Sequence, residues 1–207
     1  EERVMEMIKT VIFDIGNVLA GFEWEAYFRK FGYSKEVLSR IAKATVRSSA
    51  WSEYDRGALT DEEVMDSFIR NDPGIEKELR ESLENIKGML VRYEYAVPWI
   101  QELKQKGYQV LVLSNFAHRA HHDCKDVLDF LDYVDGGILS YQEKTVKPEQ
   151  EIYRRLLDRY GLVPEECVFL DDLETNLAAA AKFGIHTILF TGKDAAVEEL
   201  RKLGVEA

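Results

Sequence analysis

Val11-Ile12-Phe13-Asp14-Ile15-Gly16-Asn17-Val18-Leu19 is the stretch that decides the fold of this chain. It is a short apolar run that ends on an acid, followed by a glycine and further apolar residues. Such a run predicts a strand buried on both faces of a parallel sheet. Asp14 would then stand beyond the carboxyl end of that strand, where open α/β sheets bind ligands. Taken alone, Asp14 either caps a turn or helix or is the centre of a reaction.

The residues after this stretch carry helical patterns. Apolar residues recur at helical spacing at Trp24, Tyr27, Phe28 and Phe31. Thr60 and Glu63 match a capping box that opens a further helix, and another helix is expected over residues 75–86. We therefore expect a helical block over residues 20–90, uninterrupted by any strand.

Beyond residue 90 the pattern alternates between strands and helices. Strands are expected over residues 108–113, 136–139, 167–170 and 185–190. Helices are expected over residues 98–106, 118–131, 149–160, 173–183 and 194–203. This alternation predicts a doubly wound, Rossmann-like parallel sheet with right-handed crossovers. The expected domains are an α/β core of residues 1–19 and 91–207 and a helical domain of residues 20–90, above the carboxyl edge of the sheet.

Composition narrows the class of protein. A chain of 207 residues can bury a substantial core, and its formal net charge of −11 argues against nucleic acid or anionic membranes as partners. No apolar run reaches the length of a membrane span, and the N-terminus has no secretory pattern. Cys124 and Cys167 lack metal-ligand spacing, so we expect buried, reduced thiols, with a disulfide as the alternative. These features predict a cytoplasmic protein that binds neither nucleic acid nor anionic membranes.

Polar residues follow three of the predicted strands: Asp14, the pair Ser114-Asn115, and the pair Asp171-Asp172. The carboxyl ends of parallel strands share one edge of a sheet, so these side chains can converge. Clustered carboxylates repel one another unless a cation neutralises them, and hard oxygen ligands suit Mg²⁺. In the alternative, one acid of the pair caps the next helix and the other is solvated. Lys147, held extended by Pro148, could reach the same edge, although alone it would be an ordinary surface lysine.

Together these stretches resemble the haloacid dehalogenase-like superfamily of Mg²⁺-dependent phosphohydrolases. The matching segments, in order, are FDIGNVL, VLVLSN, VKPEQEIY and VFLDDLETN, and the resemblance extends from about Ile8 to Leu203. It is nearest to the subgroup with a DxGN first motif and a DDxxxN last motif. That subgroup includes sugar-phosphate phosphatases and the phosphatase domain of soluble epoxide hydrolases.

The resemblance implies a role for each matched residue. Asp14 would be the nucleophile that forms an aspartyl-phosphate, and Lys147 would screen the charge of the phosphoryl group held by Ser114 and Asn115. The implied Mg²⁺ ligands are Asp14, Asp171, Asp172 and the carbonyl of Gly16, with Asn176 orienting the last loop. The helical block would be a cap that closes over the site and excludes water.

One position departs from the family pattern. Most phosphatases of this superfamily carry a second aspartate, a general acid/base, where this chain has Gly16. Within the helical block, residues 51–57 resemble a loop that relatives point into the site. Arg56 or Tyr54 would then contact substrate, unless the stretch is an aromatic packing cluster with a surface arginine. His118 and His122 are spaced for a metal, but without a family match solvent-facing histidines are the simpler interpretation.

The sequence thus predicts a Mg²⁺-dependent phosphomonoester hydrolase that acts on a small soluble phosphate, with sugar phosphates as one candidate class. A 2-haloacid dehalogenase is an alternative, although the acids at 171 and 172 would repel its carboxylate substrate. A non-catalytic phosphate-binding or regulatory protein is a second alternative, motivated by Gly16. The sequence names neither the substrate nor the oligomeric state.

Overall fold

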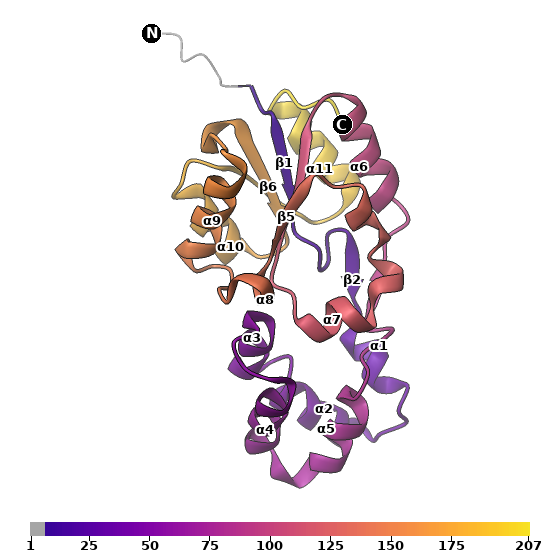
Figure 1. Ribbon diagram of the computed structural model, residues 1–207. Helices are drawn as coiled ribbons and strands as arrows, with labels where there is room; N and C mark the ends of the chain where they lie inside the picture. Colours follow the sequence, from indigo (N-terminus) through magenta and orange to yellow (C-terminus); the bar gives the residue numbers. More distant parts are fainter. Residues whose placement is uncertain (1–6) are drawn as a thin grey trace.

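The computed structural model describes residues 7–207 of the chain, and its centre is a parallel sheet (Figure 1). The strand order is β5-β4-β1-β6-β7. The strands are β1 (Thr10–Phe13), β4 (Gln109–Ser114), β5 (Gly136–Leu139), β6 (Cys167–Asp171) and β7 (His186–Leu189). Strand β1 is central, with Phe13 opposite Val112 of β4 and Leu170 of β6. The predicted doubly wound parallel sheet is confirmed.

Helices cover both faces of this sheet (Figure 1). Successive side chains of a strand point to opposite faces, so Phe13 and Ile12 belong to different halves of the core. Helices α6 (Ala96–Gln105) and α11 (Lys193–Lys202) pack on the face of Phe13, whose ring lies 4.9 Å from that of Trp99. Helices α9 (Gln150–Tyr160) and α10 (Glu174–Ala181) pack on the opposite face. Burial on both sides explains the continuous apolar run of β1.

A block of helices lies below the carboxyl edge of the sheet in Figure 1. Its members are α1 (Trp24–Arg29), α2 (Lys35–Ala44), α3 (Ser49–Arg56), α4 (Asp61–Asn71), the 3₁₀ turn η1 (Pro73–Ile75) and α5 (Glu76–Leu83). These elements span residues 24–83, and from here on the name helical block refers to this range instead of the 20–90 expected from the sequence. The predicted capping box is present: Thr60 Oγ1 accepts from the Glu63 amide at 3.2 Å, and Glu63 Oε2 accepts from the Thr60 amide at 2.7 Å.

The expectation that no strand interrupts residues 20–90 is wrong at both ends. Strands β2 (Ala20–Phe22) and β3 (Leu90–Arg92) form an antiparallel pair that joins the helical block to the sheet. Each has only three residues, too few for the alternating pattern of a strand to be visible in the sequence. The two strands pair with each other although the whole helical block separates them in the chain.

Two other segments also differ from the prediction. The helix expected over residues 118–131 is α7 (His118–Asp123), followed by the 3₁₀ turns η2 (Lys125–Val127) and η3 (Asp129–Asp132). Short α8 (Ser140–Glu143) and the turn η4 (Pro164–Glu166) carry too few residues for a helical period to be visible.

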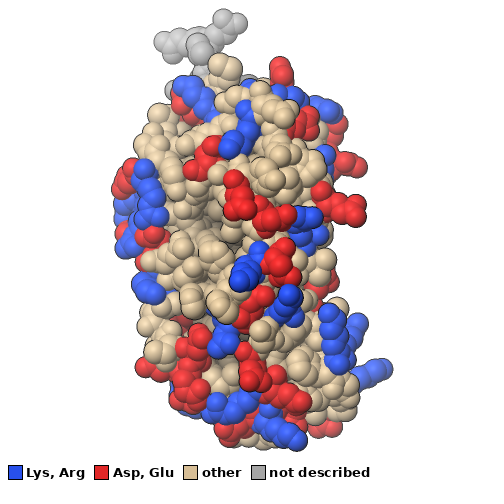
Figure 2. All heavy atoms as spheres, turned by 45° about the vertical axis from the view of Figure 1, so that its right-hand side comes forward, with Lys and Arg blue, Asp and Glu red and all other residues tan. Residues whose placement is uncertain are grey.

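The thiols match the sequence expectation, and the surface carries charges of both signs. Acidic and basic side chains are interspersed over the face in Figure 2. Cys124 and Cys167 are buried and unbridged, as predicted. None of the helices within residues 7–207 combines the length and apolarity that crossing a membrane requires. Residues 1–6, on which the expected lack of a secretory pattern largely depends, lie outside the described residues.

Candidate active site

A cavity of about 280 Å³ lies at the carboxyl edge of the sheet, enclosed partly by the helical block. Seven residues predicted from the sequence line it: Asp14, Gly16, Ser114, Asn115, Lys147, Asp172 and Asn176. Asp171 lies directly behind them and is fully buried. The strand ends thus converge as expected for a parallel sheet.

The loop after β1 fixes the position of Asp14. The Asp14 amide donates to the Leu170 carbonyl at 2.9 Å, and its carboxylate accepts from the Ile15 amide at 2.8 Å. The chain then turns at Asn17, whose φ of 60° lies in the left-handed region that asparagine tolerates. The Asn17 side chain donates to Asp172 at 3.3 Å. This loop therefore ties the end of β1 to the end of β6.

Lys147 is the buried cation of the site. Its Nζ lies 3.0 Å from Asp14 Oδ1 and 2.6 Å from Asp171 Oδ2. Asp171 also accepts from the Leu173 amide at 2.8 Å and from Asn176 Nδ2 at 3.1 Å. The Asp171 carboxylate is thus already surrounded by donors of the protein, whereas Asp172 accepts only from Asn17 among the described side chains.

Burial and charge shift the pKa values of these groups. Burial raises the pKa of Asp14 to about 6, although neighbouring Lys147 acts in the opposite direction. Burial alone would lower the pKa of Lys147, but the carboxylates of Asp14 and Asp171 hold it above its ordinary value. Burial also raises the pKa of Asp172. Three carboxylates around one lysine leave the site rich in negative charge.

The three carboxylates fit a hard divalent cation. Asp14, Asp171 and Asp172 each offer an oxygen, and these oxygens lie within 4.8 Å of one another. An all-oxygen donor set with few protein ligands suits Mg²⁺, which completes its shell with water or phosphate oxygens. The residues present therefore fit the predicted metal.

Asn115 supports Lys147 through the backbone. Its Oδ1 accepts from the Lys147 amide at 2.7 Å, and its Nδ2 donates to the Lys147 carbonyl at 3.0 Å. Both polar atoms of the Asn115 side chain are thereby engaged, which favours a positioning role over the predicted contact with a phosphoryl group. The buried Ser114 hydroxyl makes no hydrogen bond within residues 7–207 and remains suited to that contact.

Arg56 lies apart from the other predicted residues. Its guanidinium binds the Glu149 carboxylate through two hydrogen bonds of 2.9 and 2.7 Å and does not line the cavity. The two histidines spaced for a metal, His118 and His122, do not line the cavity either, and His122 Nδ1 lies 2.9 Å from Asp123 Oδ1.

Sequence reasoning passed over Asp55, which does line the cavity. It lies on α3 between Tyr54 and Arg56, the two residues considered as substrate contacts. Residues four apart on a helix share a face, and Trp51, four residues before Asp55, lines the same cavity. That spacing identifies Asp55 only once the cavity is known.

Comparison with known proteins places this geometry in a family. The model of the haloacid dehalogenase-like hydrolase family matches residues 8–184. The mouse protein Acyl-CoA dehydrogenase family member 10 is 31% identical over 209 residues, covering 94% of this chain, which spans only 19% of that protein. A sesquiterpene phosphatase of Aspergillus oryzae is 25% identical over 195 residues, covering 94% of this chain and 96% of the phosphatase.

A similar solved structure is a HAD family enzyme from Bacteroides thetaiotaomicron in complex with magnesium and inorganic phosphate. It is 25% identical with a TM-score of 0.69, covering 90% of this chain and 96% of that enzyme. The resemblance inferred from the four sequence motifs is confirmed: the chain belongs to the haloacid dehalogenase-like hydrolases.

Proposed function

We propose that this hydrolase is a Mg²⁺-dependent phosphomonoesterase that acts on a small phosphate ester through an aspartyl-phosphate on Asp14. One observation carries the proposal: three carboxylates have oxygens within 4.8 Å of one another, and two of them, Asp14 and Asp171, contact a single buried lysine. The magnesium and phosphate bound by the Bacteroides enzyme, and the phosphatase named among the relatives, support it.

The proposed chemistry divides among few side chains. An Asp14 oxygen attacks phosphorus, while Lys147 offsets the repulsion between carboxylate and phosphate. Ser114 holds a phosphoryl oxygen. The proposed metal ligands are Asp14, Asp172, Asp171 and the Gly16 carbonyl, and Mg²⁺ would supply further charge neutralisation. Among the acids after β6, Asp172 is the more open to a direct bond, because donors of the protein already surround Asp171.

The proposed domain division follows from the same arrangement. The proposed core is residues 1–19 and 91–207, of which residues 7–19 and 91–207 are described and carry the reacting groups, and the proposed cap is residues 20–90. Helix α3 of the helical block contributes Trp51 and Asp55 to the cavity wall. A cap that contributes part of the wall would exclude water from the reacting phosphate when it closes.

Metal removal tests this function. Turnover of p-nitrophenyl phosphate should require Mg²⁺ and stop in excess EDTA, and Asp172→Asn should raise the Mg²⁺ concentration needed for half-maximal rate. Asp66→Asn, on the exposed side of α4, is the matched control and should behave as wild type. Full activity in EDTA would contradict the proposal, and release of halide from a 2-haloacid under those conditions would favour the dehalogenase alternative.

Covalent catalysis has its own test. Asp14→Asn keeps the shape of the side chain but removes the nucleophile, so kcat should fall by roughly 10³-fold or more. The comparison is made on protein whose Tm shows that it is folded. Retention of most of the activity would rule out Asp14 as the nucleophile.

A further inference from the structure

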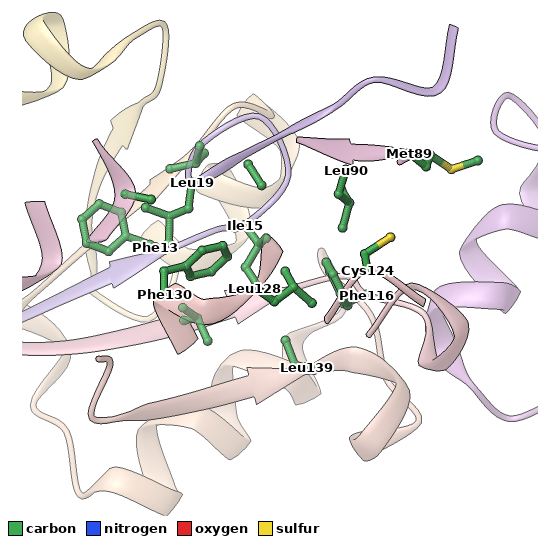
Figure 3. Packing of buried hydrophobic residues seen from close by; sticks show 14 of the residues in the cluster. Phe13, Ile15, Leu19, Met89, Leu90, Phe116, Cys124, Leu128, Phe130 and Leu139 are labelled. Carbon is green, nitrogen blue, oxygen red and sulfur yellow. The ribbon is translucent and has the colours of Figure 1, made fainter. Parts of the chain in front are cut away.

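The walls of the cavity away from the charged cluster are apolar. Their larger side chains include Phe22, Trp51, Ile86, Met89, Leu90 and Phe116. Figure 3 shows Met89, Leu90 and Phe116 at the end of the buried cluster that is nearest the helical block. Met89 and Leu90 are 1% and 6% exposed, so these walls are fixed by packing against the core.

An ester group rich in hydroxyls would lack hydrogen-bond partners against these walls. Each hydroxyl that leaves water needs a new hydrogen-bond partner, and one left without a partner weakens binding. The polar groups of the cavity gather instead around Asp14 and Lys147, where the phosphate would lie. A cavity of about 280 Å³ also suits a compact group.

We propose that this apolar wall binds the group esterified to phosphate, and that the substrates are monoesters of apolar alcohols or phenols. The inference rests on the proposed phosphatase function and narrows its substrate class away from sugar phosphates. Binding then draws on two separate sources: charge at the phosphate, and removal of apolar surface from water at the ester group.

Binding of n-alkylphosphonates with two to six carbons tests the inference without turnover. Calorimetric Kd values in the presence of Mg²⁺ should fall by about fourfold for each added methylene, up to the size of the cavity. Met89→Gln should flatten this dependence. Met65→Gln, the same exchange on α4 outside the cavity, should preserve it.

The outcomes separate this inference from the proposed function. Affinity that does not depend on chain length, or tighter binding of a polyhydroxylated phosphonate of equal size, overturns the apolar subsite. Absence of any phosphomonoester turnover contradicts the function, while the phosphonate series still measures the wall directly. If Met89→Gln does not fold, the dependence of the wild-type Kd on alkyl chain length alone tests the apolar subsite.

A second observation concerns Asp55. Its carboxylate lines the cavity together with Asp14 and Lys147 but accepts no hydrogen bond and joins no ion pair within residues 7–207. Beside Asp14, Gly16 offers no side chain, and a Cβ built there would meet no atom within 4 Å. The position of the usual second aspartate is thus open space.

The backbone around Asp55 is anchored to the core at three successive residues. The Ser140 hydroxyl donates to the Asp55 carbonyl at 2.6 Å, and Arg56 forms its double hydrogen bond with Glu149. Lys144 Nζ donates to the carbonyl of Gly57. Such anchoring holds a side chain in place at a reacting centre, which is what acid catalysis requires.

We infer that Asp55 is the general acid that protonates the leaving oxygen, in place of the missing side chain at residue 16. As Asp14 bonds to phosphorus and the phosphorus–oxygen ester bond breaks, the leaving oxygen takes the Asp55 proton. The Asp55 carboxylate then accepts a proton from the water that hydrolyses the aspartyl-phosphate, which restores the acid. The overall reaction consumes one ester and one water and yields alcohol and phosphate.

The environment of Asp55 suits this role. Burial raises its pKa to about 7; Lys147 acts in the opposite direction, and the negative charge of Asp14 adds to the rise. A carboxyl with this pKa holds a proton in a large share of molecules near neutral pH, and efficient acid catalysts have a pKa near the working pH.

A series of phosphomonoesters with graded leaving-group pKa tests the role. With Asp55→Asn, kcat on alkyl phosphates should fall by about 10² to 10⁴, whereas p-nitrophenyl phosphate, whose leaving group needs little protonation, should lose far less. Adding Gly16→Asp to this variant should restore part of the alkyl activity. Asp66→Asn is again the matched control.

Each outcome has one meaning. An equal loss on every ester assigns Asp55 to packing or closure and overturns the inference, and unchanged alkyl turnover shows that another group donates the proton. If Asp55→Asn does not fold, the wild-type series decides, because a steep dependence on leaving-group pKa would show that no general acid acts. Wild type inactive on every ester of the series contradicts the proposed function, and the role of Asp55 with it.

Discussion

At the scale of single residues, position 16 distinguishes this chain from most phosphatases of its family. Its backbone does not adopt a positive φ, unlike the adjoining Asn17, and a Cβ there meets nothing within 4 Å. An aspartate at residue 16 is therefore compatible with the local backbone.

Gly16→Asp in the otherwise wild-type chain should fold, with a Tm near that of wild type. A second acid beside the nucleophile would speed alkyl phosphates most, by up to about tenfold, since these depend most on proton donation. The measurement is the ratio of alkyl to aryl turnover in the two proteins, with Gly16→Asn as the uncharged control. A drop in Tm of many degrees would contradict the absence of strain at this position.

Other residues show where the sequence sufficed and where it did not. Asp14 and Asp172 were identifiable because buried strands do not need acids at their ends. Arg56 was considered a substrate contact, but its partner Glu149 is far along the chain, so no local pattern could show that the two side chains pair. Asp55 was overlooked because a lone acid on a helix resembles any solvated residue until the cavity is known.

At the scale of elements, the attachment of α3 to the segment before α9 depends on the pair of Arg56 and Glu149. The Arg56 guanidinium lowers the pKa of Glu149 to about 2. A carboxylate with a lowered pKa adds stability above its unfolded pKa, and this contribution is lost as the pH falls through that value towards the folded one.

Glu149→Gln should accordingly lower Tm at pH 7, and the difference from wild type should shrink steadily between about pH 4.5 and pH 2. Thermal unfolding at a series of pH values measures this. Glu25→Gln, which removes an exposed ion pair within α1, is the matched control and should change little. A difference in Tm that stays constant from pH 7 to pH 3 would show that the negative charge of Glu149 does not contribute to the stability of the fold.

Elements also differ in how far the sequence predicts them. The strands β1, β4 and β6 were visible as apolar runs because they are buried on both faces. In contrast, β2 and β3 depend on a partner across the helical block, and the region after α7 breaks into 3₁₀ turns that keep an apolar spacing without a continuous helix. Local sequence patterns therefore indicate which segments are buried, but not which distant segments pair with one another.

At the scale of the whole molecule, folding gathers three carboxylates of a strongly acidic chain into one buried cluster. A cation that binds there only in the folded state should stabilise the entire chain by mass action. At about 100 times its Kd, Mg²⁺ would add about 2.7 kcal/mol, which for a chain of this size raises Tm by roughly 5–10 °C.

Scanning calorimetry with and without Mg²⁺, at equal ionic strength set with NaCl, measures this shift. Asp172→Asn should reduce it while leaving the Tm of the metal-free protein near or above that of wild type, because one repulsive charge is gone. An unchanged Tm in millimolar Mg²⁺ would contradict a metal site in the folded chain.

The pairing of β2 with β3 has a consequence for how such a molecule can diversify. Because Ala20 lies opposite Arg92 in this two-stranded pair, the chain leaves the core and returns to it side by side, about one strand spacing apart. The segment between these two points can therefore change in length and shape without altering the register of any parallel strand. The proposed nucleophile Asp14, which follows β1, and the acids after β6 lie in the core. Asp55 and part of the apolar wall lie in the segment that can be exchanged. Exchange of this segment would then change the substrate selectivity and the proton donor together, without changing the nucleophile or its metal site.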